Sequence, residues 1–212
     1  MIAILDYKAG NLTSVERALK HLGIPCRITN SHKHIREADR VIFPGVGAAG
    51  KSMESLKELG LDRLLLDIFH SGVPILGICV GLQVLFDSSE ENDNTPCLGI
   101  LPGQVRRFPE KIRSENGSLL KVPHMGWNPV AFAGDHPVFR NIPEGSEFYF
   151  VHSYYPHPEK QEMTLGTADY GIRFTCAVGF RNLAAVQFHP EKSGRPGLQL
   201  LRNFSVWDGT LS

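Results

Sequence analysis

Cys79 is the residue whose surroundings most clearly indicate chemistry, in the segment 77–83, which reads Gly-Ile-Cys-Val-Gly-Leu-Gln. An apolar run precedes this segment and a helical pattern follows it, which is the setting of a nucleophile elbow, a sharp strand-to-helix turn. Gly77 and Gly81 stand where a larger side chain would clash with the turn. The N-terminus of the following helix favours a thiolate and directs backbone N–H groups at an oxyanion. The segment therefore predicts a cysteine nucleophile for amide cleavage, with a buried structural cysteine as the alternative.

A base for this nucleophile is predicted at His189, in the segment 186–191, which reads Val-Gln-Phe-His-Pro-Glu. A histidine just beyond a strand lies at the edge where open parallel sheets keep their sites, and Pro190 ends the pairing. Glu191 is close enough to reach the imidazole and fix its tautomer. In isolation a surface histidine beside a surface glutamate is the simpler interpretation, but the cysteine elbow favours a Cys-His-Glu triad.

A glycine-rich turn at 44–47, which reads Pro-Gly-Val-Gly, follows another apolar run. Such a turn presents a bare backbone N–H toward a substrate carbonyl. A tight connection or a phosphate loop are the alternatives. We treat the phosphate loop as the weaker alternative, although residues 45–52, Gly-Val-Gly-Ala-Ala-Gly-Lys-Ser, match its G-x-x-x-x-G-K-S spacing.

The composition is that of a globular protein, with 212 residues, 42% of them hydrophobic and 21% charged. This length suits a single domain over residues 1–212. The 22 basic and 22 acidic residues balance, so nothing indicates a nucleic-acid or membrane partner. No apolar run is long enough to span a bilayer, and the first six residues lack the basic region and cleavage site of a signal peptide. We therefore expect a buried first strand and a cytoplasmic protein.

The other cysteines and histidines form no pattern that indicates chemistry. No C-x-x-C pair and no tight Cys/His spacing is present, so neither disulfides nor a metal cluster are expected, and the predicted chemistry needs no cofactor. The remaining eight histidines, His124 and His152 among them, are expected to be structural or surface residues.

The first half of the chain alternates strands and helices. Strands are predicted at 1–7, 24–29, 40–43 and 73–79, and helices at 11–22, at 51–69 with a break near Gly60, and from 81 to 86. Thr13 and Glu16 are spaced as in a capping box, and Gly23 suits a left-handed helix end. Strands that are apolar on both faces, joined by helices, indicate a parallel sheet covered on both sides.

The second half contains shorter strand-like runs. These are predicted at 98–108, 119–122, 148–154, 164–168, 175–180 and 184–188, and a helix at 196–207 closes the chain. Asn116-Gly117 is a hairpin signal, and the polar segment 90–94 predicts a surface loop. The whole pattern therefore predicts a core of parallel strands from the first half of the chain, with mixed or antiparallel strands added by the second half.

The motifs at 44–47, 77–83 and 187–191, in this order, resemble those of the class I glutamine amidotransferases. The resemblance covers nearly the whole chain, and the three motifs together are highly specific. It implies an α/β fold, a flavodoxin-like domain with a mixed central sheet and helices on both faces. It also implies release of ammonia from glutamine.

Three further segments resemble one branch, the glutaminase subunit of imidazole glycerol phosphate synthase in histidine biosynthesis. They are Asp-Tyr-Lys-Ala-Gly-Asn-Leu at 6–12, Pro-His-Met-Gly-Trp-Asn at 123–128 and Phe-Val-His-Ser-Tyr at 150–154. That branch forms a heterodimer with a separate (β/α)-barrel cyclase subunit. The resemblance implies that ammonia passes through the barrel to a ribonucleotide intermediate, giving imidazole glycerol phosphate and an aminoimidazole carboxamide ribotide.

The resemblance also implies roles for the matching residues. The catalytic residues would be Cys79 as nucleophile, His189 as acid and base, and Glu191 as its orienter. The oxyanion hole would be formed by backbone amides, those of Val80 and, once a peptide turns over, Val46 or Gly47. The amino-acid end of glutamine would be bound by Gln83, Glu91 and the backbone of Ser153 and Tyr154. The positions toward the cyclase are Asn11, Trp127, Tyr149 and Lys192.

Departures from the pattern are small. Val80 and Leu82 stand where leucine and methionine are frequent, and both are volume-tolerant exchanges. Lys8 stands where glycine is frequent, near the expected docking face. Simpler interpretations remain open for single residues: Trp127 and Tyr149 as core aromatics, Gln83 as a surface helix residue and Glu91 as a solvated acid.

Three other functions compete with this one. The amidotransferase subunit of anthranilate or aminodeoxychorismate synthesis would keep the triad, but the segments at 6–11 and 123–128 do not resemble that branch. A non-catalytic scaffold on the same fold should have lost a triad member, and all three are present. A generic cysteine hydrolase or peptidase would need neither Gln83 nor this form of the oxyanion turn.

Overall fold

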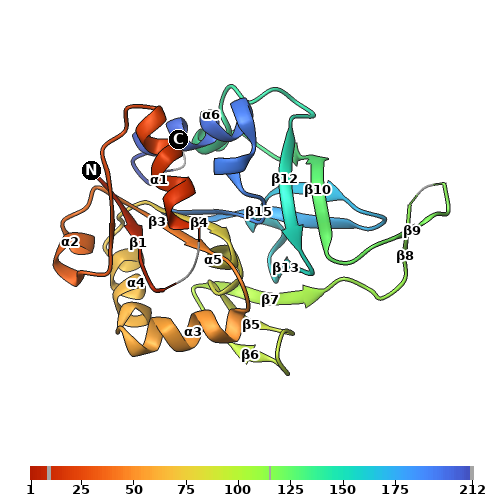
Figure 1. Ribbon diagram of the computed structural model, residues 1–212, viewed down its shortest axis with the longest axis horizontal. Coiled ribbons are helices and arrows are strands. Elements are labelled where there is room, and N and C mark those ends of the chain that lie inside the picture. Colours follow the sequence, from red (N-terminus) through yellow and green to blue (C-terminus); the bar gives the residue numbers. More distant parts are fainter. Residues whose placement is uncertain (9–10, 115, 211–212) are drawn as a thin grey trace.

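The computed structural model describes residues 1–8, 11–114 and 116–210, and an eight-stranded sheet runs through its centre (Figure 1). The strand order is β11-β14-β15-β16-β4-β3-β1-β2. These strands are β1 (Ile2–Leu5), β2 (Cys26–Thr29), β3 (Arg40–Gly45), β4 (Ile75–Cys79), β11 (Ala131–Phe132), β14 (Thr164–Asp169), β15 (Arg173–Phe180) and β16 (Leu183–Val186).

The sheet is mixed, as predicted. Strands β2, β1, β3, β4 and β16 run parallel to one another, whereas β15, β14 and β11 add on beyond β16 in antiparallel orientation. Every residue of β1, β4 and β16 is buried. Such continuous apolar strands form where helices cover both faces of a sheet, and this burial explains their composition.

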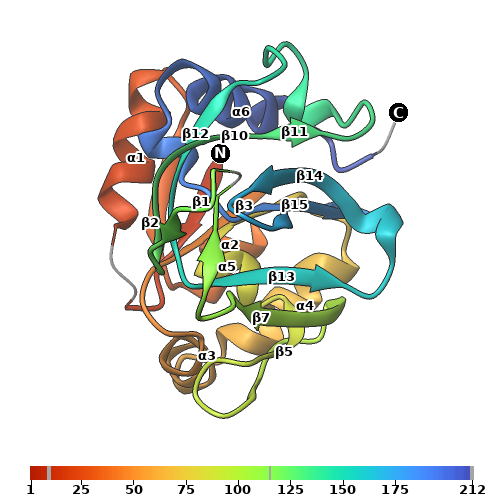
Figure 2. The ribbon, with the colours of Figure 1, turned by 90° about the vertical axis from the view of Figure 1, so that its right-hand side faces the viewer.

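Helices cover both faces of the sheet, which confirms the predicted fold class. In Figures 1 and 2, α1 (Leu12–His21) and α6 (Gly194–Val206) lie on one face. The other face carries α2 (His32–Arg36), α3 (Ala49–Glu58), α4 (Leu61–His70) and the short α5 (Val80–Gln83). None of the helices among the described residues is long and apolar enough to cross a membrane.

Smaller sheets flank the central one. The strands β5 (Phe86–Ser89), β6 (Thr95–Pro96), β7 (Leu101–Arg107) and β13 (Tyr154–Pro158) form one sheet, and β10 (His124–Pro129) pairs with β12 (Glu147–His152). The predicted hairpin around Asn116-Gly117 forms between β8 (Ile112–Arg113) and β9 (Leu119–Leu120). The expected loop at 90–94 is a largely exposed turn between β5 and β6. The short 3₁₀ helices are η1 (Pro137–Phe139), η2 (Gln161–Met163) and η3 (Pro190–Lys192).

The glycine signals at helix ends were correct, but the capping box was wrong. Gly23 and Gly60 both have left-handed backbones, with φ of 70° and 64°, and Gly60 separates α3 from α4. Helix α1 begins at Leu12, so Thr13 lies inside it. The N-cap is Asn11, which makes no side-chain cap bond because its amide is directed elsewhere, as described below.

Other features also differ from the prediction. Pro44 does not end β3, which continues to Gly45. Because β1 pairs with β3 only as far as Ile42, Pro44 has a single neighbouring strand, and such an edge tolerates proline. The helix after Cys79 ends at Gln83, where the chain turns into β5. Helix α2 and strand β10 were not predicted: α2 has only five residues, and β10 contains Gly126 and polar residues.

Candidate active site

Cys79 occupies a strained turn between β4 and α5, with φ of 55° and ψ of −113°. The predicted need for small neighbours is confirmed. A Cβ on Gly81 would collide with the backbone carbonyl of Phe43 in β3, and one on Gly77 would lie 2.9 Å from side-chain atoms of Ala185 and Leu85. The elbow therefore folds directly against the neighbouring strands, and this contact is what holds the strained cysteine in place.

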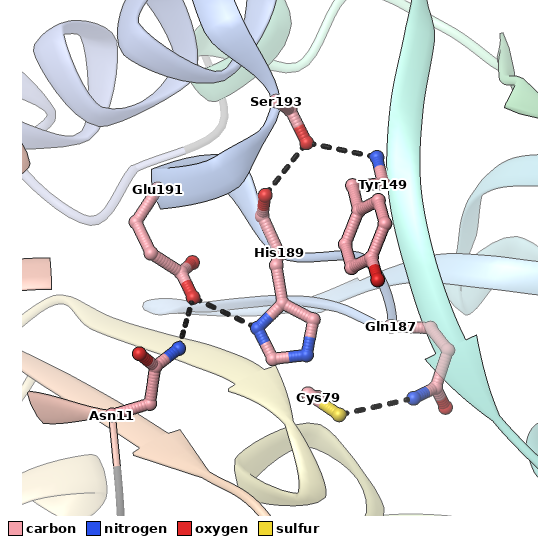
Figure 3. Close-up of polar contacts among 7 residues, drawn as sticks. All are labelled: Asn11, Cys79, Tyr149, Gln187, His189, Glu191 and Ser193. Carbon is pink, nitrogen blue, oxygen red and sulfur yellow. Dashed lines mark hydrogen bonds and ion pairs between the residues drawn. The ribbon is translucent and has the colours of Figure 1, made fainter. Parts of the chain in front are cut away.

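His189 and Glu191 meet at the carboxyl end of β16. His189 Nδ1 lies 2.8 Å from Glu191 Oε1, and the two side chains are 2% and 1% exposed. Figure 3 shows the imidazole ring between the Glu191 carboxylate and the Cys79 sulfur. In the part of the chain that the structure describes, His189 Nε2 has no hydrogen-bond partner. The ring is thus anchored on one side and available to the sulfur on the other.

The backbone of His189 is fixed by Ser193, to which the sequence assigned no role, and by Tyr149, which was predicted only to face the cyclase. The His189 N–H donates to the carbonyl of Tyr149 in β12 at 2.9 Å. Its carbonyl accepts a hydrogen bond from the Ser193 hydroxyl at 2.6 Å, and the same hydroxyl accepts from the Tyr149 N–H at 3.0 Å (Figure 3). Strand β12 therefore positions His189. The sequence could not indicate the role of Ser193, because a serine four residues after a histidine is too common to be informative.

The electrostatics of the His189 site favour the imidazolium. Burial by itself lowers the pKa of His189, but the nearby Cys79 sulfur and the Glu191 carboxylate outweigh burial and raise this pKa to about 10. The arrangement therefore suits a thiolate beside an imidazolium that is ready to donate its proton.

A cavity of about 290 Å³ opens at Cys79 and His189. The predicted oxyanion residues Val46, Gly47 and Val80 all line it. Gly47 has φ of 91°, a backbone conformation that glycine adopts without strain, and a Cβ there would meet nothing within 4 Å. Val80 directly follows the cysteine as the first residue of α5.

The four predicted substrate-binding residues, Gln83, Glu91, Ser153 and Tyr154, line the same cavity. Gln83 is 4% exposed, so its interpretation as a surface residue was wrong. Its Nε2 donates to the carbonyl of Tyr154 at 3.1 Å and to Oε1 of Gln187 at 3.0 Å. Glu91 Oε2 accepts from the Ala49 N–H at the start of α3, at 2.6 Å.

Gln187 lies beside Cys79, and the sequence assigned it no role. Its Nε2 donates to Cys79 Sγ at 3.7 Å (Figure 3). Alternation was the available signal, since a residue two before His189 on an extended segment points to the same side.

Three of the predicted docking residues form one cluster. The Trp127 ring is 53% exposed and meets Tyr149 edge-on at 6.1 Å, and the Lys192 ammonium lies 5.7 Å from the centre of the Tyr149 ring. Trp127 is therefore not a core aromatic. The fourth, Asn11, donates from Nδ2 to Glu191 Oε1 at 2.8 Å, so its side chain faces the candidate triad.

The N-terminal segment that carries Asn11 is only partly described, because Ala9 and Gly10 lie outside the described residues. Lys8 has φ of 68°, a conformation that explains why glycine is frequent there in the family it resembles. Its ammonium pairs with Glu58 of α3 at 3.2 Å. Across 1–8, 11–114 and 116–210, no group of three or more His, Cys, Asp or Glu side chains could hold a metal ion.

Comparisons with known proteins agree with this geometry. The family model described as glutamine amidotransferase class-I matches residues 3–207. The fold is similar to a structure described as a crystal structure of glutamine amidotransferase, with a TM-score of 0.72 at 19% identity, covering 97% of this chain and 99% of that one. It is also similar to the structure of PurLQS from Thermotoga maritima, with a TM-score of 0.69 at 14% identity, covering 96% of each chain. The chain belongs to the class I glutamine amidotransferases.

Within that family its relatives define a narrower group. The chain is 54% identical over 207 residues to imidazole glycerol phosphate synthase subunit HisH of Nitratidesulfovibrio vulgaris (strain Miyazaki F), covering 98% of this chain and 97% of the relative. It is 50% identical over 209 residues to the HisH subunit of Pseudomonas syringae pv. syringae, covering 98% of each. The group is that of the HisH subunits, and the branch predicted from the sequence is confirmed.

Proposed function

We propose that this chain hydrolyses glutamine to glutamate and ammonia, with Cys79, His189 and Glu191 as its catalytic triad, and delivers the ammonia to a cyclase subunit. The observation that carries the proposal is the convergence of a strained cysteine and a buried, carboxylate-anchored histidine on one cavity. The anthranilate-type alternative is disfavoured by the HisH relatives, and a scaffold would not need a complete triad.

In the first half of the cycle, the Cys79 thiolate attacks the side-chain amide carbon of glutamine and a carbon–sulfur bond forms. Backbone N–H groups at Val80 and at the Val46–Gly47 turn hold the oxyanion. The His189 imidazolium protonates the amide nitrogen, and the carbon–nitrogen bond breaks. Ammonia leaves, and a γ-glutamyl thioester remains on Cys79.

In the second half, His189 Nε2 accepts a proton from water as the water attacks the thioester carbonyl. The carbon–sulfur bond breaks, glutamate leaves and the thiolate–imidazolium pair is restored. Glu191 stays ionised and holds the tautomer and orientation of His189 through the 2.8 Å contact. One glutamine and one water thus give one glutamate and one ammonia, without a metal or an organic cofactor.

The amino-acid end of glutamine is bound at the far wall of the cavity. The carboxylate of Glu91 attracts the α-ammonium group, and Gln83 with the backbone of Ser153 and Tyr154 supplies hydrogen bonds. Glu91 is itself tied to the first N–H of α3, which limits its motion. This arrangement selects an amino acid over a peptide.

The HisH relatives are named as subunits of imidazole glycerol phosphate synthase, and this supports the cyclase subunit of that enzyme as the partner. The exposed cluster of Trp127, Tyr149 and Lys192 provides an aromatic and a cationic anchor for docking. Ammonia released to water at pH 7 becomes protonated and unreactive, so delivery through the docked barrel protects it. The cyclase then makes imidazole glycerol phosphate and the aminoimidazole carboxamide ribotide. Because a nucleophilic thiol survives best in a reducing compartment, we place this reaction in the cytoplasm.

The test is glutamate release from glutamine by this chain alone, and then with an imidazole glycerol phosphate synthase cyclase subunit and its nucleotide ligand. We expect weak release alone and strong stimulation in the complex, both abolished by Cys79→Ala. Cysteine-dependent release that ignores the cyclase would keep the glutaminase but contradict the acceptor. No release in any mixture would contradict the proposal.

A further inference from the structure

Two buried histidines lie behind the candidate glutamine site. His124 of β10 and His152 of β12 are cross-strand partners, and they are 2% and 5% exposed. His124 Nδ1 lies 2.9 Å from His152 Nε2. His152 also lines the cavity that contains Cys79 and His189. The triad mechanism uses neither of them, and no pattern in the sequence indicated that they pair.

The surroundings of this pair keep both rings uncharged. The His124 ring stacks on Tyr170 at 4.1 Å and on Phe150 at 4.9 Å, and Phe108 and Phe174 lie 5.2 and 5.3 Å from the His152 ring. Burial in this aromatic cage lowers the pKa of His124 to about 4 and that of His152 to about 3. Both are therefore neutral imidazoles near pH 7.

Because both rings are neutral, their neighbours define which nitrogen carries each proton. The Tyr154 carbonyl only accepts, so His152 Nδ1, 2.8 Å away, is the protonated nitrogen and its Nε2 is bare. His124 must then donate from Nδ1, which leaves its own Nε2 bare. Asn128 Nδ2 donates to that nitrogen at 3.3 Å, and its amide is oriented by a second bond to the Asp169 carbonyl at 2.8 Å.

The result is a one-way chain of hydrogen bonds from Asn128 through His124 and His152 to the Tyr154 carbonyl. Asn128 is the neighbour of Trp127, so the chain begins beside the docking cluster. At its other end, the Tyr154 carbonyl also accepts from Gln83 Nε2, which holds Gln187, and Gln187 donates to Cys79 Sγ. Both N–H groups of the Gln83 amide donate hydrogen bonds, one to the Tyr154 carbonyl and one to Gln187. The orientation of the Gln83 amide therefore depends on the position of the Tyr154 carbonyl.

We propose that His124 and His152 are positioning residues for glutamine: their fixed tautomers hold the Tyr154 carbonyl and, through it, the Gln83 wall of the substrate cavity. They act through the cavity wall and do not exchange protons with the substrate. This inference rests on the proposed function, because it assigns glutamine to that cavity.

The kinetic test compares two substitutions of His124 in the complex with the cyclase subunit and its nucleotide ligand. His124→Phe keeps the aromatic stacking but removes both nitrogens, so His152 Nε2 loses its donor. We expect the KM for glutamine to rise about tenfold, the size of one lost buried hydrogen bond, and kcat to stay within about threefold. His124→Asn retains a donor near the Nδ1 position and should restore most of the affinity. A wild-type KM in His124→Phe, or a fall in kcat at constant KM, would overturn the positioning role.

A second measurement needs neither activity nor a substitution, and it decides the question if His124→Phe fails to fold. Nitrogen-15 NMR of the histidine side chains in the wild-type chain at pH 7 reads each tautomer directly. We expect both His124 and His152 to carry the proton on Nδ1 with a bare Nε2. An Nε2–H tautomer or a cation at either residue would overturn the chain of bonds. If the wild type released no glutamate that depends on Cys79, the proposed function would be contradicted. The tautomers could still be measured, so the two failures are distinguishable.

Discussion

Asn11 donates a hydrogen bond to the same carboxylate oxygen of Glu191 that contacts His189, each at a distance of 2.8 Å. Asn11 lies at the start of α1 and was predicted to face the cyclase. A residue of the expected docking face therefore holds the orienting carboxylate directly. A partner that moved Asn11 would change the geometry of His189 without contacting the triad, and this provides a short physical route from docking to chemistry.

Loss of this contact should slow catalysis. In Asn11→Ala, Glu191 loses the hydrogen bond from the Asn11 amide and the imidazole is held less firmly. We expect glutamate release without the cyclase to fall about three- to tenfold, as for other residues that orient a catalytic group. The control is Lys33→Ala, which removes only an exposed ion pair with Glu37. Equal rates in Asn11→Ala and the control would contradict the role of this contact.

The proton affinity of His189 should depend on the cysteine. The raised pKa of His189 depends on the nearby Cys79 sulfur as well as on Glu191, whereas burial acts in the opposite direction. Cys79→Ala removes the thiolate and leaves the burial, so the pKa of His189 should fall by more than one unit. A histidine NMR titration of the wild type and the variant measures this difference. An unchanged pKa would show that the sulfur and the ring do not interact.

The elbow should tolerate no side chain at Gly81. Gly81→Ala places a Cβ against the Phe43 carbonyl, and we expect a loss of at least about 2 kcal/mol of stability, or failure to fold. Gly72→Ala is the matched control, since Gly72 has φ of 83° but open space around it. That substitution should cost only the backbone strain, about 1 kcal/mol. Urea unfolding measures the free energy of unfolding of both variants. Similar losses of stability would contradict the claim that close packing against β3 excludes a side chain at Gly81.

Much of this architecture was predictable because its signals are local. The apolar runs that became β1, β4 and β16 are buried along their whole length, and Gly60 separates two helices as its position suggested. The elbow glycines were recognisable from their spacing around Cys79. Glu191 follows His189 so closely that their contact could be inferred from the chain alone.

Other features depend on segments that are distant in sequence. Gln187, Asn11 and the pair of His124 and His152 acquire their partners only when strands and loops far apart in the chain meet. Alternation along its segment could have indicated Gln187, but no periodicity marks the contacts of Asn11 or of the histidine pair in advance. Strand β10 was missed for a related reason, because its pairing with β12 and not its composition makes it a strand. Contacts between residues that are close in sequence were therefore easier to predict than contacts between residues that are far apart in the chain.

Acid should destabilise the fold through three buried histidines. Burial holds the pKa values of His124 and His136 at about 4 and that of His152 at about 3, below the unfolded value of 6.5. Between pH 4 and pH 6.5 these three histidines bind more protons in the unfolded chain than in the folded chain. Their contribution to the free energy of unfolding is therefore complete above pH 6.5 and is lost as the pH falls. Each histidine should add about 1.4 kcal/mol per pH unit to the slope of stability in that window. Urea unfolding at pH 5 and pH 6.5 measures the slope. In His124→Phe the slope should be shallower by the contribution of one histidine, about 1.4 kcal/mol per pH unit. An identical slope in that variant would contradict a neutral, buried His124.

The central claim is that Cys79 carries the glutamyl group during turnover. The direct measurement is mass spectrometry of the complex after rapid acid quenching with isotope-labelled glutamine, followed by digestion. We predict a labelled γ-glutamyl group on the peptide that contains Cys79, and none in Cys79→Ser. Turnover without any adduct, or an adduct on Cys26, Cys97 or Cys176 instead, would contradict the account.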